Sequence, residues 1–546
     1  MSSDETVVKR SRWLLPSFAA LALLVALGSG WGFTVDDALI STRVAHHIRQ
    51  GLGPRFNPGG PWVDCVTPLG WAWLLAPFSA DGAWAGLCAA RWLGVGCAFA
   101  SVWIATRFID RSLRARSQDA ERKPVPLRAL LGCVPLATCL PLGAWSSSGM
   151  ETAFVMLIAS LTLCGGWWTP GASALACALR PEMFPWALTL ALSRPVSGAK
   201  ARILGVAMTI AGPTLVALLR LSLFGHPAPL ALLAKPSEAS QGFVYAAFGF
   251  VQCGLPCLMF GTSIFQRAAV NEHGKQLRAQ ALALIAHLGA LVIAGGDWMA
   301  LYRLFVPVLP CAWAAGVVIL TEQSKRVAYA KLLAASVAGL WLNWTLGSSS
   351  RGVFQARKQL VEAARGQLAS ARVVGALDVG WVGASGDFEV VDFAGLTDRE
   401  IALLAGGHTS KRLPRELLWR KHVDTLVLLT APGELPAADS TAWQGLRFAR
   451  VVEARASALE GASEFAWLTT LPLAHTAQHY IIAQRPTERF ALGGVDTLTH
   501  VAIRPQRTTR KLHRSNREIG ALASVVCDRS LSDEPRHFRR CAPEPR

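Results

Sequence analysis

Long apolar runs separated by short polar segments dominate the chain as far as Leu346. Several runs approach the roughly 20 residues that a helix needs to cross a bilayer, and others are shorter. We expect about eleven spanning helices, a number that the pattern settles to within one or two. The runs are Trp13–Trp31, Gly82–Thr106, Ala129–Trp145, Thr152–Trp168, Gly171–Leu179, Met183–Leu192, Ile203–Phe224, Phe243–Ile264, Ala281–Ala294, Leu304–Thr321 and Ala328–Leu346.

Two further segments predict helices that lie at the membrane surface. Asp36–Gln50 places its aliphatic residues near one face and most of its polar residues elsewhere, which is typical of an amphipathic helix. Pro68–Phe78 is too short to span, and we expect Trp71 and Trp73 to sit at the depth of the lipid headgroups.

After Leu346 the apolar density falls, and Arg351–Arg365 predicts a polar helix that leads into a soluble region. Short β-rich runs there alternate with helix-like stretches such as Asp398–Leu404, which favours a small α/β domain. The β-rich runs are Val373–Leu377, Phe388–Phe393, Thr425–Leu429, Phe448–Val452 and His479–Ala483. The expected organisation is a membrane domain over 1–348 with a first outer loop over 32–81, an α/β domain over 349–525, and a basic tail over 526–546. We expect the tail to be disordered, and its Cys527 and Cys541 are candidates for a disulfide.

Composition supports a membrane protein and argues against a nucleic-acid binder. The chain is 52% hydrophobic and 16% charged, with a mean hydropathy of +0.34. Its net charge of +18 comes largely from short basic clusters between apolar runs, the pattern that sets membrane topology. The cluster between Arg107 and Arg128 is the densest, so that loop should be cytoplasmic.

With that loop inside, most of the carboxylates associated with the spans fall on the opposite, outer side. They are Asp36, Asp37, Asp64, Glu151, Glu182 and Asp297. An ionisable group beside lipid is costly and is usually retained for a site, a relay or an ion pair.

These outer groups have a functional and a structural interpretation. Asp36 and Asp37 follow the first span, where one could act as a general base on an acceptor hydroxyl, or both could simply cap a helix. Four outer cations could hold a phosphate, or could only snorkel to the interface. These cations are Arg43, Arg180, Lys235 and Arg303.

Several short motifs then resemble a known family when they are taken in order. They are Asp36-Asp37-Ala38-Leu39-Ile40-Ser41 with Arg43, Gly51-Leu52-Gly53, Phe56-Asn57-Pro58-Gly59, Thr67-Pro68-Leu69, Ser148-Gly149-Met150-Glu151-Thr152, Arg180-Pro181-Glu182, Phe224-Gly225-His226-Pro227 with Lys235, Gly295-Gly296-Asp297-Trp298-Met299 with Arg303, and Asp392-Phe393-Ala394-Gly395-Leu396-Thr397-Asp398. In this order and spacing the chain resembles the mycobacterial terminal β-(1→2) arabinofuranosyltransferase family and its bacterial relatives, membrane glycosyltransferases of the GT-C architecture.

The resemblance implies a multi-pass enzyme of a bacterial cytoplasmic membrane, with its active site and C-terminal domain extracytoplasmic. Such enzymes transfer a sugar, here arabinofuranose in the first instance, from a polyprenyl-phosphate donor to a cell-envelope glycan or lipid acceptor. It implies catalysis by Asp36 first and Asp37 second. The implied donor phosphate and sugar pocket is lined by Arg43, Glu151, Arg180, Glu182, Lys235, Asp297 and Arg303.

The chain also departs from the family pattern. Asp64-Cys65-Val66-Thr67 stands in place of a Glu-Gly-Tyr-Thr type segment, and Pro227-Ala228-Pro229-Leu230 in place of Pro-Leu-Pro-Asn. Sugar, acceptor and linkage therefore stay open. No cofactor is required by the sequence, and the use of a divalent cation also stays open. The alternatives are a glycolipid transporter or flippase, and a non-catalytic scaffold.

Overall fold

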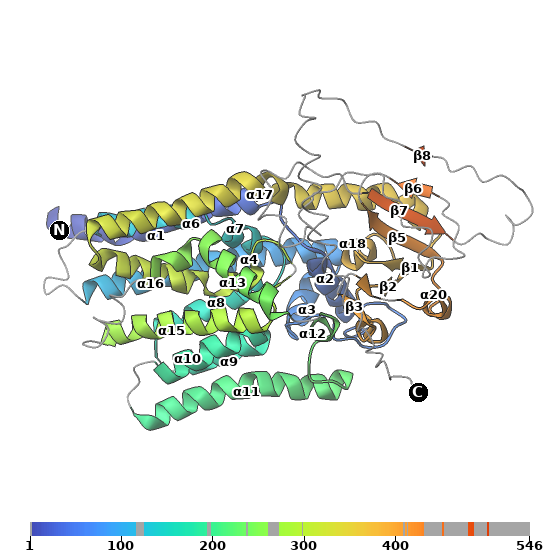
Figure 1. Ribbon diagram of the computed structural model, residues 1–546, viewed down its shortest axis with the longest axis horizontal. Coiled ribbons are helices and arrows are strands. Elements are labelled where there is room, and N and C mark those ends of the chain that lie inside the picture. Colours follow the sequence, from blue (N-terminus) through green and yellow to red (C-terminus); the bar gives the residue numbers. More distant parts are fainter. Residues whose placement is uncertain are drawn as a thin grey trace, which may run out of the picture. The chain divides into compact units, whose positions relative to one another are not determined.

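The computed structural model is mostly helical, and Met1–Val501 forms one compact unit (Figure 1). It describes residues 3–115, 125–166, 168–193, 198–235, 238–259, 272–297, 299–407, 410–411, 413–430, 450–452, 479–484 and 500–501. The predicted tail over 526–546, with Cys527 and Cys541, lies outside these residues.

Five helices in the described residues are long and apolar enough to cross a membrane, which supports the membrane class of the protein. They are Trp13–Gly30 of α1 (Ser3–Gly30), α4 (Ala83–Arg114), α11 (Ala199–Phe224), Gly274–Ile293 of α15 (Glu272–Ile293), and Arg303–Glu322, which joins η5 (Arg303–Val308) to α16 (Leu309–Glu322). A sixth results if Leu127–Ala137 and Leu140–Ser146, bent by 62°, count as one span.

Several of the other predicted runs form shorter or broken helices. The run Ala129–Trp145 divides into α5 (Leu127–Leu131), α6 (Cys133–Ala137) and α7 (Leu140–Ser146). The next runs become α8 (Thr152–Leu161) with η2 (Thr162–Cys164), α9 (Thr169–Leu179), η3 (Pro181–Met183) with α10 (Phe184–Ser193), and α13 (Ala239–Gln252) with η4 (Leu255–Met259). Helices this short cannot cross a bilayer alone.

The spanning helices differ in how much of their surface other helices cover. The Arg303–Glu322 span is 94% buried inside the protein, whereas α11 is only 11% buried and packs on α9 and α10 alone among the stronger contacts. Figure 1 shows α11 at the edge of the helical bundle. Its exposed leucines and isoleucines suit contact with lipid tails.

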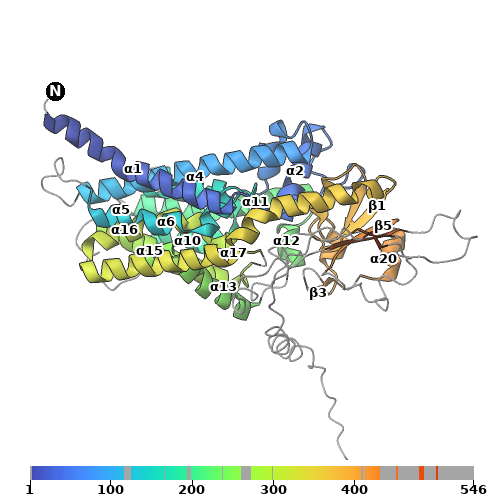
Figure 2. The same cartoon turned by 90° about the horizontal axis from the view of Figure 1, so that it is seen from above.

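Helix α17 (Lys325–Leu368) joins the membrane part to the C-terminal domain without a break. It has 44 residues, about 66 Å at ~1.5 Å per residue. It includes the apolar run Ala328–Leu346 and the polar helix predicted at Arg351–Arg365, so the boundary expected at residue 348 falls inside one helix. Figure 2 shows α17 running from the bundle to the strands.

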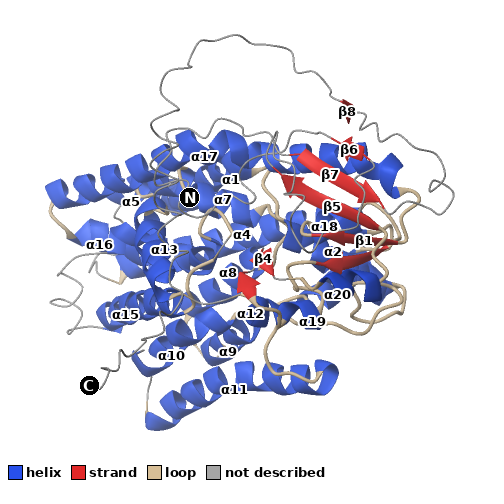
Figure 3. Cartoon of the chain, turned by 45° about the vertical axis from the view of Figure 1, so that its right-hand side comes forward, coloured by secondary structure: helices blue, strands red, loops and turns tan. Residues whose placement is uncertain are grey.

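The C-terminal region contains a sheet with helices between its strands in sequence (Figure 3), while its predicted status as a separate domain stays a prediction. Strands β1 (Val373–Ala376), β2 (Glu389–Asp392) and β5 (Thr425–Thr430) are parallel, and β7 (His479–Gln484) pairs antiparallel with β5. With β6 (Arg450–Val452) and β8 (His500–Val501), the strand order is β2-β1-β5-β7-β6-β8. Helices α18 (Val379–Gly383), α19 (Arg399–Ala402) and α20 (Arg415–Arg420) lie between the strands in sequence, and β3 (Gly406–Gly407) and β4 (Ser410–Lys411) form a hairpin.

The prediction for Asp36–Gln50 was right about the helix and wrong about its surroundings. Helix α2 (Asp36–Arg49) packs against α4 and against α18 of the C-terminal region, so most of its polar residues are covered by protein, and only its last turn is exposed. The prediction for Trp71 was wrong too. Pro68–Phe78 contains α3 (Trp71–Leu75) and η1 (Ala76–Phe78), in which Trp73 is exposed but Trp71 is buried against Phe154.

The guanidinium of Arg43 fastens α2 to the C-terminal domain. It donates to the carbonyls of Phe56 at 2.9 Å, Phe388 at 2.9 Å and Gly386 at 3.3 Å, and also to that of Gly383. Burial lowers the pKa of Arg43 to about 10, which leaves it charged at neutral pH. One buried cation therefore satisfies four carbonyl groups that the domain contact removes from water.

Asn57 fastens the first loop to the same domain. Its side-chain amide donates to Val390 O at 2.8 Å and accepts from Val390 N at 2.9 Å, so it pairs with edge strand β2 as a strand residue would. These contacts explain two motifs, Arg43 and Phe56-Asn57, as docking elements.

We predict that Arg43→Met loosens the C-terminal domain. Four buried carbonyls lose their donor, which we expect to cost about 2–4 kcal/mol and to lower the apparent Tm in detergent by a few degrees. Limited proteolysis should cut the variant between α17 and β1 sooner than wild type. Arg49→Met, in the exposed last turn of α2, is the control and should behave like wild type. Equal Tm and proteolysis for the two variants would contradict this role.

Candidate active site

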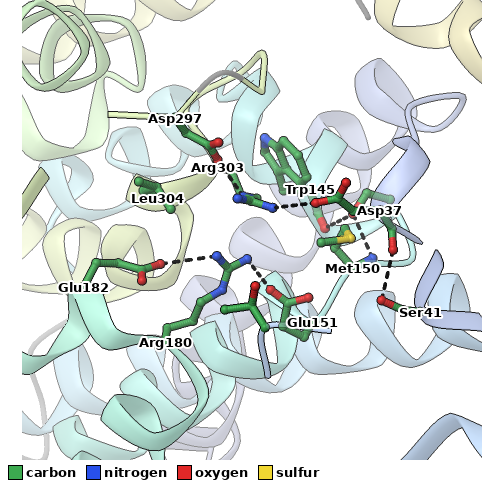
Figure 4. A network of polar contacts seen from close by, with 12 residues as sticks. Asp37, Ser41, Trp145, Met150, Glu151, Arg180, Glu182, Asp297, Arg303 and Leu304 are labelled. Atoms are coloured by element: carbon green, nitrogen blue, oxygen red, sulfur yellow. Dashed lines mark hydrogen bonds and ion pairs between the residues drawn. The ribbon is translucent and has the colours of Figure 1, made fainter. Parts of the chain in front are cut away.

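Six ionisable side chains from four segments of the chain meet in one network of ion pairs (Figure 4). Two arginines organise it, and each lies between two carboxylates. Arg303 contacts Asp297 and Asp37, and Arg180 contacts Glu151 and Glu182. Each carboxylate comes from a different segment of the chain, so the network exists only in the folded protein.

Arg303 lies at the start of η5 and is 9% exposed. Its Nε is 2.7 Å from Asp297 Oδ2, and its Nη1 is 3.9 Å from Asp37 Oδ2. The guanidinium also stands over the ring of Trp145, 5.8 Å from its centroid, a distance at which a cation–π interaction contributes. The fully buried Trp145 is therefore part of the site, and the sequence contained no signal that pointed to it.

The loop between α15 and η5 positions Asp297 and Arg303. Gly295 and Gly296 have φ of 79° and 76°, and a Cβ at Gly296 would lie 2.8 Å from Tyr245 Cβ, so glycine is required there. Leu301 and Tyr302 also have positive φ. For residues with a side chain this backbone conformation costs about 1–2 kcal/mol each. Trp145 Nε1 donates to Leu301 O at 2.9 Å and holds this strained turn in place.

Arg180 follows the last turn of α9, and Glu151 immediately precedes α8. A cation at a helix C-terminus and an anion at a helix N-terminus are each favoured by the helix dipole. Arg180 donates to Glu151, and its Nη1 is 3.4 Å from Glu182 Oε1. The side chains of Arg180 and Glu151 are 5% and 1% exposed, so neither charge would be tolerated there without the other.

Lys235 follows α12 (Leu230–Ala234) and completes the set of charges. Burial lowers its pKa, and the nearby carboxylates of Asp37 and Asp297 oppose that lowering. Helix α12 packs against α19, which places Lys235 through a contact with the C-terminal domain.

The motif Asp392–Asp398 builds the turn on which α12 rests. The buried Asp392 carboxylate accepts from Ala394 N at 2.8 Å, Gly395 N at 3.1 Å and Thr397 N at 2.7 Å, and burial raises its pKa to about 6. Asp398 caps α19 by accepting from the backbone N–H of Glu400 and Ile401. This motif therefore acts as a support for the site.

Asp37 combines partial exposure to solvent with a carboxylate oxygen that has no hydrogen-bond partner among the described residues. Its side chain is 18% exposed, and its Oδ1 is buried with no hydrogen-bond partner among the described residues. Burial raises the pKa of Asp37, while the positive charges of Lys235 and Arg303 lower it. A carboxylate with a raised pKa and an unused oxygen is suited to accept a proton.

Asp36 contacts the C-terminal region and not the network. It is 8% exposed, and its Oδ1 accepts from Trp381 N at 2.9 Å in α18. Its neighbour on the helix thus reaches the network, whereas Asp36 binds the C-terminal domain. The geometry therefore favours Asp37, which reverses the order expected from the motif.

The structure brings together most of the expected site residues. Those that converge are Asp37, Glu151, Arg180, Glu182, Lys235, Asp297 and Arg303. Arg43 lies outside this network, because its guanidinium donates to the carbonyls of Phe56 and of the C-terminal region, and its role in donor binding stays a prediction. Asp64, another outer carboxylate, pairs with Arg220 of α11 at 2.8 Å outside this network.

The site holds four carboxylates and three cations, and the arginines occupy the positions where a metal would bind the carboxylates. Among the described residues no group of three or more histidine, cysteine, aspartate or glutamate side chains has the arrangement of a metal site. The residues present therefore do not fit the divalent cation that some GT-C enzymes use, and no step below depends on one.

No protein-family model matches the chain, and no curated protein or solved structure is significantly similar to it. The family resemblance consequently rests on the motifs, and the site is interpreted from its own geometry.

We predict that Glu151 and Arg180 are strongly coupled in stability. Glu151→Gln and Arg180→Gln alone should each cost about 3 kcal/mol, because each leaves a buried charge without its main partner. The double variant should recover about 2 kcal/mol of the summed loss. Thermal unfolding in detergent measures this cycle. The more exposed pair Asp110–Arg114 on α4 is the matched control, with a coupling of about 0.5 kcal/mol. Additive effects at Glu151 and Arg180 would refute the pairing.

Proposed function

We propose that this protein transfers a sugar from a polyprenyl-phosphate donor to an envelope glycan or lipid acceptor. In this proposal it crosses the bacterial cytoplasmic membrane about eleven times and has its site on the outer face. The observation that carries the proposal is Asp37, a half-buried carboxylate whose buried Oδ1 has no hydrogen-bond partner among the described residues, beside Lys235 and Arg303. Base and cations close together are what glycosyl transfer from a phosphate requires.

In the reaction an acceptor hydroxyl attacks the anomeric carbon of the donor. The new bond joins the acceptor oxygen to that carbon, and the bond from the same carbon to the phosphate oxygen breaks. Asp37 takes the proton of the attacking hydroxyl, and the bonding electrons leave with the polyprenyl phosphate. The raised pKa of Asp37 makes it a stronger base than an exposed aspartate.

Lys235 and Arg303 are the cations best placed for the phosphate. Each arginine lies between two carboxylates, but the second contact of Arg303 is the longer one: its Nη1 is 3.9 Å from Asp37 Oδ2, against 3.4 Å from Arg180 Nη1 to Glu182 Oε1. Arg303 therefore has more capacity for another anion. Negative charge that develops on the leaving phosphate is stabilised by such fixed cations in a site of low polarity. Transfer of the Asp37 proton to bulk solvent then restores the base.

The carboxylates supply acceptors for the sugar. Glu151 Oε2 is buried and has no hydrogen-bond partner among the described residues, so it is available to a sugar hydroxyl. A site that hydrogen-bonds hydroxyl groups discriminates strongly against sugars that lack them. Arabinofuranose is the sugar that the motif resemblance favours, and the departures at Asp64–Thr67 leave the acceptor to be determined.

We predict that Asp37→Asn lowers the transfer rate by about 10²–10⁴-fold, because the amide cannot accept the proton. Asp36→Asn should lower it by less than about tenfold, since the retained Oδ1 still accepts from Trp381 N. The measurement is sugar transfer from a synthetic polyprenyl-phosphate arabinose by purified protein, and thermal unfolding verifies that each variant is folded. Full activity of Asp37→Asn would exclude the mechanism. Flipping of a labelled glycolipid in proteoliposomes without any transfer would instead identify a transporter.

We predict that Lys235 sets the pH dependence of transfer. Asp37 must be deprotonated, so the rate falls as pH falls through its pKa. Lys235 holds that pKa down, and Lys235→Met should therefore move the acid limb of the rate profile to higher pH. Lys235→Arg keeps the charge and should leave the limb near its wild-type position. An acid limb that stays in place in Lys235→Met would show that the titrating group is not Asp37.

A further inference from the structure

A pocket lies apart from the Asp37 network. It has a volume of about 570 Å³, within the range of small-molecule sites, and it is open to solvent. Its walls come from the end of α1, the start of α4, the polar half of α17, and the residues after α18. The residues used below are Trp31, Cys88, Arg91, Trp92, Lys358 and Arg365.

The pocket lies where two membrane-length helices end. Trp31 directly follows the apolar helix Trp13–Gly30, and Trp92 lies in the third turn of Ala83–Arg114. Their rings are 5.3 Å apart and are 42% and 60% exposed. Exposed tryptophans at the ends of spans are typical of the headgroup region of a bilayer, so one side of this pocket faces that region.

The remaining polar lining is positive. Its charged residues are three cations, Arg91, Lys358 and Arg365, and one carboxylate, Glu362. Phe354, Lys358, Val361 and Arg365 recur at helical spacing and form one stripe along α17, which rises about 16 Å from Phe354 to Arg365. Glu362 Oε1 lies 3.7 Å from Lys358 Nζ in an exposed pair that neutralises little of this charge.

We propose that this pocket binds the phosphate headgroup of an anionic phospholipid. Lys358 and Arg365 of α17 would face the phosphate, and the acyl chains would run along the exposed apolar surface beside Trp31 and Trp92. Arg91 donates to the carbonyls of Ser147 and Trp31 and contributes its charge from the wall of the pocket. This site is separate from the proposed sugar transfer and does not depend on it.

The ring contacts favour a lipid headgroup over a sugar. Stacking a sugar needs a free aromatic face, but the guanidinium of Arg91 lies over the rings of Trp31 and Phe354 at 5.0 and 5.2 Å. Trp84 is packed between Phe354 and Trp381. Charge, and not stacking, is therefore the recognition that the pocket offers.

Cys88 provides a readout at the site itself, because it lines the pocket and is exposed. The experiment measures the rate of N-ethylmaleimide labelling of Cys88 by peptide mass spectrometry, with the full chain in neutral detergent. Short-chain phosphatidylglycerol should slow labelling by at least about fivefold, and short-chain phosphatidylcholine should not. Glycerol 3-phosphate, which lacks the acyl chains, should have little effect at the same concentration.

Variants of α17 make the test specific. Lys358→Gln with Arg365→Gln should abolish protection by phosphatidylglycerol, and Glu362→Gln should strengthen it. Lys325→Gln with Arg326→Gln removes two exposed cations from the other end of the same helix and should leave protection unchanged.

Four results would overturn the proposal. They are equal protection by the two phospholipids, no protection by either, protection by glycerol 3-phosphate as strong as by the lipid, and protection by a neutral oligosaccharide alone. The third would indicate a soluble phosphate ligand, and the fourth a glycan site.

Discussion

Mutual neutralisation of buried charge is the constraint on which this structure depends. Four carboxylates and three cations lose most of their hydration beside a bundle of apolar helices, and the cost would be too high for any of them alone. Two of the pairs join separate segments of the chain, Glu151 with Arg180 and Asp37 with Arg303. The ends of α2, α8 and α9 and the loop before η5 must therefore meet at one place. The helices can therefore pack in this way only if the charged side chains pair with one another.

The C-terminal domain takes part in forming that site. Arg43 and Asn57 bind its backbone and fix α2, which carries Asp37. The Asp392 turn supports α19, and α19 packs against α12, which leads to Lys235. Both ends of the proposed catalytic machinery are thus held by a domain that supplies none of the reacting groups. Helix α17 continues from the bundle into the C-terminal region without a break.

Neighbouring residues acquire different chemistry from their surroundings. Asp36 and Asp37 are adjacent carboxylates in the first turn of α2, and they point to different partners about 100° apart around the helix. Asp36 accepts a backbone hydrogen bond from α18, while Asp37 lies beside Arg303 and keeps one oxygen unused. The arginines divide in the same way, since Arg43 binds carbonyls, Arg220 binds Asp64, and Arg91 lies over two aromatic rings.

The sequence by itself indicated the membrane class, the longer strands of the C-terminal region, and seven of the residues that converge in the network. Apolar run length, short β-rich runs and the cost of charge near lipid are local or compositional signals, and they can be detected along one chain. Only the tertiary structure decided that α2 is enclosed, that Arg43 is a docking residue, that Trp145 belongs to the site, and that Asp37 and not Asp36 faces it. Those properties depend on which distant segment covers a side chain, and a pattern along the chain carries no record of that contact.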